Sequence, residues 1–506
     1  MLNKHTGQRD LYDEMVFERL VPQDHLLVQI ATHIDFTFVY EIVKDRYSPV
    51  GRGSKDPVIM VKILLLEYLY NLSDVEVTKR IQTDIAFRWF LGLGIEDLVP
   101  DDTTISFFRV KRLKETHFEQ IFTELVRVCI QKNLIKTRRY IIDSTDVAAN
   151  VNYPSDKKLL RNAYQKVIKE VMKFDDKLAG EYQKAVEQEI DAVYEQMEKV
   201  PAKKHYEITE KYIQQLYVKT HEELKTNMAY GEALSMCETI IDQILTNNKK
   251  DAIVSIVDPD ARIAHKTRGV LKKGYKNHIL VDEDSEIILS STQTPFNVPD
   301  GRKCIELLEK VNDQLGLKSA EFSADRAYGE IKNRAYLKDH GIISNIAFYQ
   351  ESKHENEVFG IKSFTVSADV TSVICPAGAT ATKYRLRKSN SKTEYKEFNF
   401  AASDCKECYL RKQCIKKYMG KKRRLTVAFR YDAVLRDRER IKTAAFQKAY
   451  NNRSKVERRF ATLVRNHGLR RCRSVRLPRA KIHIILANMA CNVVRMVNLL
   501  EQPNTT

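Results

Sequence analysis

The chain has 506 residues, of which 43% are apolar, nine cysteines and a formal net charge of +18. This length and composition are ordinary for a globular protein of two to four domains with a sizeable core. Residues 1–10 lack the apolar stretch behind a positive cap that is typical of a signal peptide, so we expect a cytoplasmic protein. The nine cysteines are therefore expected to be reduced thiols rather than a disulfide framework, and some of them could form one metal cluster.

Helical patterns fill the first part of the chain, up to about residue 135. Residues 57–71 are apolar nearly all round, which predicts a buried helix. Ser73 and Glu76 have the spacing of a capping box, so a second helix is expected to begin there and to run to about Phe90.

A third helix is expected to begin with Asp102 or Thr103 as its N-cap and to end in basic residues. Short capped helices of this kind are typical of a helix-turn-helix motif that reads DNA. A plain helical bundle with a solvated basic face has the same pattern, and the sequence leaves both interpretations open. The basic residues are Arg109, Lys111, Arg112 and Lys114.

Residues 138–145 form a short apolar run that contains Asp143 near its end. Such a run predicts a buried strand that delivers a carboxylate to its end. An aspartate in this position is also a common turn residue, so Asp143 defines no site until partners are found.

Residues 154–250 are strongly charged and contain two glycines and, after Pro154, one further proline, Pro201. We predict a helical insertion, whose simplest form is a long antiparallel hairpin that breaks near Pro201 and projects from the body. Its role is either that of a spacer or that of a clamp for DNA or a partner. A heptad seam is formed by Leu160, Tyr164, Val167, Val171, Phe174 and Leu178.

Strand patterns return at residues 252–258, 277–282 and 286–290, separated by Gly and Asp, which predicts an antiparallel meander. Asp258 and Asp260 flank a proline and are interpreted as turn residues.

Asp300 is interpreted as the cap of a helix over residues 300–315. Residues 320–325 then form another strand that ends in an acid, Asp325, and a helix and a strand follow. In such an α/β unit we expect Asp143 and Asp325 at one edge of the sheet. Asp146 is a neighbour that could support the site indirectly.

Between about residues 348 and 429 the pattern becomes short and β-like, with four cysteines and a C-x2-C spacing. Four thiols in a segment too small for its own core suit a tetrahedral zinc site. Four unrelated reduced thiols are the alternative. The cysteines are Cys375, Cys405, Cys408 and Cys414.

Residues 416–481 contain 23 Lys and Arg against four Asp and Glu, so the rest of the chain is close to neutral. Local basicity of this kind predicts a polyanion-binding face. Within it, Tyr450, Arg453 and Glu457 lie at offsets of three and four, which places them on one face of a helix. The later apolar segment, residues 482–500, is interrupted by polar residues and is expected to be a packing helix rather than a membrane span.

Asp143, Asp325 and Glu457 are the proposed site. Two carboxylates ~4 Å apart repel by roughly 4 kcal/mol at an effective dielectric near 20, so three clustered acids need cations. A pair of Mg²⁺ ions about 3.5 to 4 Å apart satisfies this need and catalyses phosphodiester chemistry. The basic segment would then contact the phosphates of a duplex.

At these residues the sequence resembles the DDE transposases of bacterial insertion sequences. The resemblance is to the branch whose third acid lies in a signature of Tyr, two residues, Arg, three residues, Glu, six residues and Lys. Tyr450, Arg453 and Glu457 match it, while Val464 stands at the Lys position beside Arg465. The cysteine insertion is similar to that of the insertion-sequence family numbered eleven eighty-two. Residues 51–57 and 100–109 resemble the helical domain of these enzymes, and residues 142–145, 258–262, 274–278 and 324–329 resemble their catalytic core.

The resemblance implies an α/β chain with an RNase H-like catalytic core over residues 138–506. A helical N-terminal domain, residues 1–137, would bind DNA ends. A long helical insertion at 153–250 and a small β-rich, cysteine-containing insertion at 348–430 would interrupt the core.

It also implies cleavage at terminal inverted repeats and strand transfer into target DNA, dependent on two Mg²⁺ or Mn²⁺ ions held by Asp143, Asp325 and Glu457. A structural Zn²⁺ would sit in the cysteine insertion. The implied partner is double-stranded DNA, with a homo-oligomer forming on the DNA ends and the protein associated with the nucleoid. The expected DNA-binding residues are Tyr450, Arg453, Lys455, Arg458, Arg459, Arg465, Arg470, Arg471 and Arg473.

Two other functional classes remain open. One is a DNA-binding regulator without catalysis, left by a decayed element, against which the three intact acids argue. The other is an RNase H-like nuclease that cuts without joining.

Overall fold

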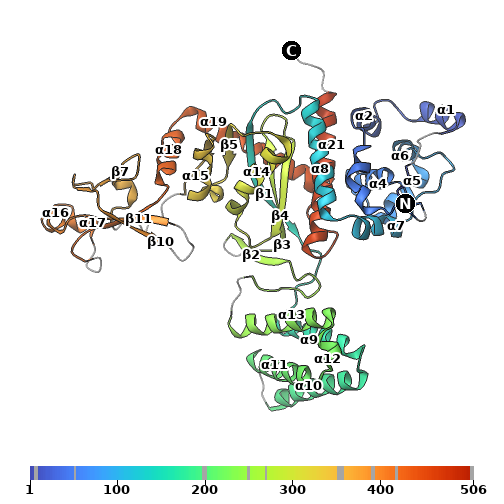
Figure 1. The fold of residues 1–506 in the computed structure, drawn as a ribbon, viewed down its shortest axis with the longest axis horizontal. Helices are drawn as coiled ribbons and strands as arrows, with labels where there is room; N and C mark the ends of the chain where they lie inside the picture. Colours follow the sequence, from blue (N-terminus) through green and yellow to red (C-terminus); the bar gives the residue numbers. More distant parts are fainter. Residues whose placement is uncertain are drawn as a thin grey trace.

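The computed structural model describes residues 1–4, 9–50, 53–196, 202–247, 251–267, 270–349, 358–388, 394–415 and 420–501. The fold is mixed α/β and has three hydrophobic cores (Figure 1). The first core joins the N-terminal helices, the main sheet and the last helix. The second lies in the helical insertion and the third in the cysteine-containing part, which we call the cysteine module (residues 358–429).

The N-terminal helices follow their sequence signals, with two exceptions. Ser73 and Glu76 form the predicted capping box. The helix after it ends at Thr83 and not near Phe90, because the Asp84 carboxylate caps a new helix. The elements are α1 (Leu11–Leu20), α2 (Leu26–His33), α3 (Phe38–Val43), η1 (Lys44–Arg46), the buried α4 (Pro57–Leu69), α5 (Asp74–Thr83), α6 (Ile85–Leu91), α7 (Asp102–Phe107), a π-helical turn (Phe108–Arg112) and α8 (Glu115–Gln131).

The second exception is the cap of α7. Asp101, not Asp102 or Thr103, is the N-cap, because its carboxylate accepts a hydrogen bond from the Thr104 N–H at 2.6 Å.

The main sheet has the strand order β2-β3-β1-β5-β6, and β4 also pairs with β3. The pairs of β3 with β1, β2 and β4 are antiparallel, whereas β1 with β5 and β5 with β6 are parallel. The strands are β1 (Arg139–Ala148), β2 (Arg262–Thr267), β3 (Val270–Asp282), β4 (Ile288–Pro295), β5 (Glu321–Ala324) and β6 (Ile343–Ile346). Short helices between them are η3 (Asp300–Lys303), α14 (Cys304–Leu315), η4 (Arg326–Tyr328) and α15 (Ile331–Asp339).

The predicted antiparallel meander is confirmed, but its first strand is β2 and not residues 252–258. The side chain of Gln243 accepts from the Ile253 N–H and donates to the Ile253 carbonyl, both at 2.9 Å. These are the backbone groups that a neighbouring strand would bind. The segment therefore packs with the helical insertion and does not join the sheet.

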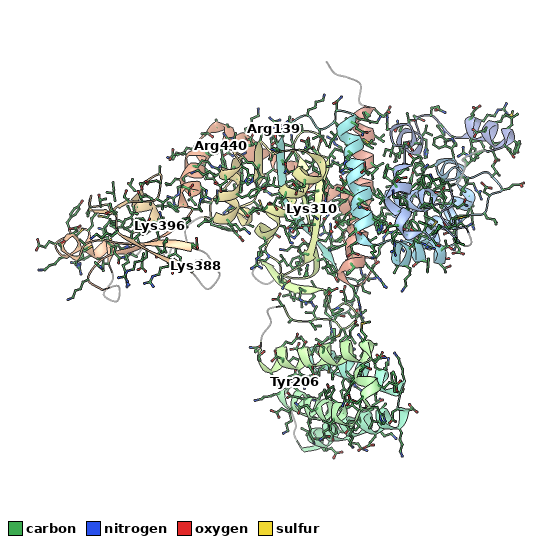
Figure 2. The ribbon with its side chains drawn as sticks, in the orientation of Figure 1. Arg139, Tyr206, Lys310, Lys388, Lys396 and Arg440 are labelled. Carbon is green, nitrogen blue, oxygen red and sulfur yellow. The ribbon has the colours of Figure 1, made fainter. Side chains whose placement is uncertain are left out.

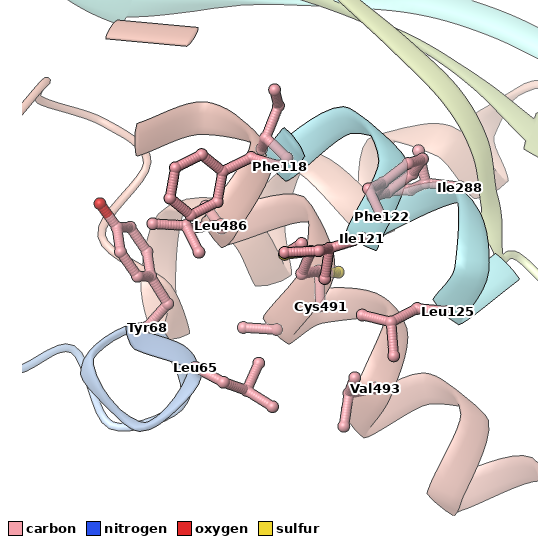
Figure 3. Close-up of a cluster of buried hydrophobic side chains, with 14 of the residues drawn as sticks. Leu65, Tyr68, Phe118, Ile121, Phe122, Leu125, Ile288, Leu486, Cys491 and Val493 are labelled. Atoms are coloured by element: carbon pink, nitrogen blue, oxygen red, sulfur yellow. The ribbon is translucent and has the colours of Figure 1, made fainter. Parts of the chain in front are cut away.

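The helix α21 (Leu477–Leu500) passes between the N-terminal helices and the sheet, packed against α4, α8 and β4. Figure 3 shows Leu486, Cys491 and Val493 of α21 beside Leu65 of α4 and Ile288 of β4. This helix is long and apolar enough to cross a membrane, but 78% of its apolar window is buried in the protein, as the sequence predicted for a packing helix. A bent pair of helices, α2 with α3 and η1, passes the same test only when counted as one broken span.

The predicted helical insertion is confirmed, but it is not a single hairpin. Its own core holds together α9 (Asp156–Met172), α10 (Asp176–Gln196), α11 (Ala202–Lys219), α12 (Glu222–Lys225) and α13 (Met228–Leu245). The predicted seam is buried only up to Val171, because α9 ends at Met172 and Phe174 is 46% exposed. The expected break near Pro201 lies outside the described residues.

The cysteine module is β-rich, as predicted, and lies on the far side of the sheet from the N-terminal helices (Figure 1). One of its two small sheets has β7 (Thr365–Val366), β8 (Val373–Ile374) and β9 (Thr380–Ala381), and the other has β10 (Tyr384–Lys388), β11 (Glu394–Asn399) and β12 (Arg424–Ala428). Its helices are η6 (Ile361–Ser363), α16 (Ala402–Lys406) and α17 (Arg411–Cys414), and the chain returns to the body through α18 (Tyr431–Ile441), α19 (Ala444–Asn452) and α20 (Ser454–Asn466).

The shared first core leads to a prediction about Leu486, which is 1% exposed. Leu486→Ala should lower the free energy of unfolding by about 2–5 kcal/mol, because the cavity lies where α21 meets α4 and α8. Hydrogen exchange should then show lost protection in the N-terminal helices and in the sheet together.

Leu234→Ala, in the core of the insertion, is the matched control and should affect the insertion alone. Lost protection confined to the N-terminal helices in the Leu486 variant would contradict a shared core.

Candidate active site

Asp143 and Asp325 lie one residue beyond the last parallel pair of β1 with β5. That pair is Ile142 with Ala324, so the register carries both acids to the same point of the sheet. The expectation that the first strand ends at Asp143 is wrong, since β1 continues to Ala148 in antiparallel pairing with β3. One neighbouring strand stops where the other continues, and this opens the sheet beside the two carboxylates.

Burial raises the pKa of Asp143 to about 6. The backbone N–H of Ser144, at 2.8 Å, and the guanidinium of Arg453, at 3.1 Å, act in the opposite direction. The negative charges of Asp325 and Asp300 raise the pKa further. Asp143 is therefore the centre of a group of acids that interact through their charges.

Asp300 is a member of this group that sequence reasoning missed. The prediction that Asp300 caps a helix is wrong. Asp300 is the first residue of the short helix η3, which precedes α14, and no side chain caps either helix. Its carboxylate accepts from the Ser144 hydroxyl at 2.9 Å and from the Lys276 ammonium at 2.8 Å. The signal was its position: Asp300 follows β4, and β4 ends at the same sheet edge as β5 because both are parallel to β1.

His278 lies under this acid, with its Nδ1 3.9 Å from Asp300. Burial lowers the pKa of His278 to about 4, so the ring is neutral near pH 7. The positive charge next to Asp300 is therefore that of Lys276.

Glu457 approaches the group from α20, which packs on β1 through the buried Val456. Its side chain is 62% exposed and lies 3.7 Å from the guanidinium of Arg453. Arg453 therefore bridges Asp143 and Glu457. The expectation of one continuous helix is wrong, because Tyr450 belongs to α19 and Arg453 is the junction with α20.

The carboxylates of Asp143 and Asp325 are oxygen donors of the kind that Mg²⁺ prefers. Over the described ranges, no three His, Cys, Asp or Glu side chains are arranged to hold a metal ion. In this arrangement Arg453 supplies the positive charge between Asp143 and Glu457. The two sheet acids fit a divalent ion, and in this arrangement both Asp143 and Glu457 pair with Arg453.

The remaining acids have structural partners. Asp258 is buried and accepts from the Tyr275 hydroxyl. Asp260 accepts from the Leu477 N–H at 2.9 Å, at the start of α21.

The basic segment, residues 416–481, does not form one face. Residues 420–429 belong to the cysteine module. Basic side chains of α18 form ion pairs with acids of the body. Arg440, for example, donates to Glu321 at 2.8 Å. The interpretation of the whole segment as one polyanion-binding face is therefore wrong.

Several of the expected DNA-binding residues also have internal partners. Arg458 and Arg459 pair with Glu286, in the latter case at 3.1 Å. Lys455 donates to the Glu283 carbonyl at 3.0 Å. Those that remain exposed are Arg458, Arg465, Arg470 and Arg471.

Arg470 lies 3.7 Å from Asp146, which also pairs with Lys272 at 2.9 Å. Arg473 donates to the Asn71 side chain at 2.8 Å, so it joins the C-terminal segment to the N-terminal helices.

In the N-terminal helices, Arg109 is not a DNA-facing side chain. It pairs with the fully buried Glu67 at 2.9 Å and with Asp74 at 2.5 Å. The Arg112 guanidinium lies over the Tyr47 ring. At these two positions the helical-bundle interpretation describes the structure better than a recognition helix does.

The four cysteines come from separate parts of the module, Cys405 from α16 and Cys414 from α17, and gather in and around its core. Cys405 and Cys414 are buried, and Cys375 packs against the same core. Burial raises the pKa of Cys414, and the neighbouring thiols Cys405, Cys375 and Cys408 raise it further. The thiols are therefore close neighbours, although they do not form a metal cage.

Two family models match the chain. Residues 15–111 match one described as Transposase domain (DUF772), and residues 374–497 match one described as Transposase DDE domain. Both matches support a DDE transposase of an insertion sequence. The second match includes the four cysteines of the module and Glu457, but it begins after Asp143 and Asp325.

A curated relative is the uncharacterized protein ORF8 in the nfe locus of Rhizobium meliloti. It is 24% identical over 182 residues, which is 35% of this chain and 87% of the relative. No solved structure matches the chain. The transposase domains support an enzyme that binds and acts on DNA, and this family implies use of a divalent metal.

The raised pKa of Asp143 predicts a stability difference that depends on pH. Its folded-state pKa of about 6 exceeds the ordinary 3.8, so folding disfavours the charged form. Below about pH 4 the carboxyl is neutral in both states, and above about pH 6 it is charged in both. Asp143→Asn should therefore stabilise the metal-free protein by up to ~3 kcal/mol above pH 6, with the gain lost toward pH 4.

Thermal midpoints in EDTA at pH 4.5 and 7.5 measure this difference. The exposed Asp313→Asn is the control and should show none. An equal shift of the Asp143 variant at both pH values would contradict burial as its cause.

Proposed function

We propose that the chain is a transposase with an RNase H-like core, which cleaves DNA at terminal inverted repeats and transfers the ends into target DNA. One observation carries this proposal. Asp143 and Asp325 lie together just beyond the parallel pairing of β1 with β5, beside a helix that brings Glu457 toward Asp143, in a chain with two transposase-domain matches.

The sheet supports the RNase H-like part of the proposal. Three antiparallel strands, β4, β3 and β1, lie beside two strands parallel to β1, and the acids come at the carboxyl end of this parallel part. Ligands of open α/β sheets bind outside the carboxyl ends of strands. The cysteine module favours the insertion-sequence family numbered eleven eighty-two.

Asp143, Asp325 and Glu457 would hold the divalent ions. Bound there, Mg²⁺ or Mn²⁺ would activate the attacking oxygen and stabilise the leaving one. Arg453 keeps Glu457 near Asp143 by pairing with both. Asp300 positions Asp143 through Ser144. The Asp300 carboxylate accepts a hydrogen bond from the Ser144 hydroxyl, and the Ser144 N–H donates one to Asp143.

The other parts have proposed roles in DNA binding. Residues 1–137 would bind the DNA ends. The exposed arginines of the basic segment, Arg458, Arg465, Arg470 and Arg471, would contact phosphates. The protein would act as a homo-oligomer on two ends, in the nucleoid. The helical insertion would serve as a spacer, because its 16 Lys and Arg are balanced by 17 Asp and Glu.

The acids are tested by isosteric substitution. Asp143→Asn, Asp325→Asn and Glu457→Gln should each abolish cleavage and joining and leave DNA binding largely intact, because the amide keeps the shape and loses the charge that holds the ion. The assay uses full-length protein, labelled terminal-repeat DNA and Mg²⁺ or Mn²⁺. Glu439→Gln, on the exposed side of α18, is the matched control and should retain activity.

The alternatives give different results in the same assay. Wild-type protein that binds but never cuts would favour a DNA-binding regulator. Cutting without joined product would favour a nuclease. Activity retained by Glu457→Gln would remove that residue from the site.

We also propose a structural Zn²⁺ bound by Cys375, Cys405, Cys408 and Cys414. The thiols gather at the core of a small module, and a thiolate set of this kind suits tetrahedral zinc. Elemental analysis of the purified protein should find about one zinc per chain, and Cys405→Ser with Cys408→Ser should remove it and destabilise the module. A metal-free wild type whose stability is unchanged by these substitutions would refute the zinc site.

A further inference from the structure

The cysteine module carries an excess of positive charge, and its last part, residues 416–429, also belongs to the basic segment 416–481. Residues 358–429 contain 16 Lys and Arg against five Asp and Glu. Figure 2 shows Lys388 and Lys396 in this module, on the far side of the molecule from the N-terminal helices.

The sheet of β10, β11 and β12 has two different faces. In its register, Tyr384, Phe398 and Leu425 form one row across the strands, and the next row on the same face contains Lys396 and Val427. Phe398, Leu425 and Val427 are buried in the third core. The alternate residues therefore form the opposite face, which points away from this core.

That opposite face, which we call the outer face, carries most of the exposed charge of the sheet. Arg385 and Arg387 alternate along β10, Lys383 lies two residues before Arg385, and Arg424 lies across the sheet on β12. All four side chains are exposed. Other polar groups of the face are Tyr395, Asn399 and Thr426.

Negative charge is scarce on this face. Among its described residues Glu397 is the one acid, and it lies 3.7 Å from Arg387. Lys383, Arg385 and Arg424 form no ion pair within the described chain. This differs from Arg440 and Arg459, whose charges are matched by acids of the body.

Charged side chains also protect edge strands against unwanted pairing, and β10 is an edge strand. Edge protection alone does not require the charges to share one face. Here Lys383, Arg385 and Arg387 share the outer face, while Leu386, at 65% exposed, and Tyr384, at 40%, occupy the other. Lys388 also lies on that other face, but Glu394 pairs with it at 2.9 Å. Lys383 and Arg385, whose charges no acid of the described chain matches, are both on the outer face, and this points to a ligand.

We propose that the outer face of the β10–β11–β12 sheet binds the phosphate backbone of duplex DNA, independently of sequence and separately from the acid group. The proposal rests on the proposed function, which supplies DNA as the polyanion. Guanidinium groups bind phosphate oxygens in a bidentate manner. Residues two apart on a strand repeat every ~6.7 Å, so three of them present a line of cations to a line of phosphates.

The test compares variants of the full-length protein that lose equal charge. The face variant is Lys383→Gln, Arg385→Gln and Arg387→Gln. The control is Lys169→Gln, Lys177→Gln and Lys184→Gln, which removes three exposed charges from the helical insertion. Fluorescence anisotropy measures binding to a 40-base-pair duplex of arbitrary sequence, in EDTA, over a series of KCl concentrations.

The face variant should bind more weakly, and the slope of log affinity against log salt should fall by ~2.7, or ~0.9 for each lost contact. Glu397→Gln should bind more tightly than the wild type. R385K with R387K should keep most of the salt slope, and both of these variants remain informative if the neutral variant fails to fold.

Three results would overturn the proposal. One is equal weakening in the face variant and the insertion control, and another is no gain from Glu397→Gln. The third is tighter binding of an RNA duplex that is lost in the face variant, which would assign the surface to RNA. A wild type that binds no duplex at all would instead count against the proposed function, whereas loss of cleavage in the acid variants bears only on the acid group.

Discussion

The burial of α21 between the N-terminal helices and the sheet is the interaction on which the rest of the structure depends. Its apolar side chains contact α4, α8 and β4, so the first core extends across all three. Two polar side chains fix its position: Asn492 accepts from the Ile288 N–H and donates to the Ile288 carbonyl, and Asn488 bonds to Asn277. Residues 467–476 connect α20 to α21, and α20 packs on β1. The same packing therefore places Glu457 beside the sheet acids.

Charge is distributed in opposite ways on the central sheet and on the cysteine module (Figure 1). Around Asp143, acids from separate elements are brought together, and Arg453 and Lys276 balance them. Burial of a carboxylate within this group raises the free energy of the folded protein, and the neighbouring acids add to it, as the raised pKa of Asp143 shows. On the cysteine module the excess is positive and faces solvent. The two arrangements suit two different ligands, a cation at the first and a polyanion at the second.

The sequence predicted features that depend on local chemistry and strand order. The capping box at Ser73, the buried helix α4 and the strand before Asp325 required only neighbouring residues. The cysteine positions likewise marked a small β-rich module. Features decided by contacts across long separations were missed. Arg459 and Glu286 are such a pair, as are Asp300 and Ser144, because no local pattern tells which basic side chain will meet which acid.

The helical insertion leaves and rejoins the body at nearly one place. Residues 150–154 and 255–257 line the same cavity. The Gln243 side-chain amide, in the last helix of the insertion, binds the backbone of Ile253, where the chain returns to the body. The entropy of closing a loop grows only with the logarithm of its length, by about 0.6 kcal/mol for each doubling. Compared with a turn of a few residues between β1 and β2, the insertion therefore adds only about 3 kcal/mol of closure entropy, and its size can vary without moving Asp143.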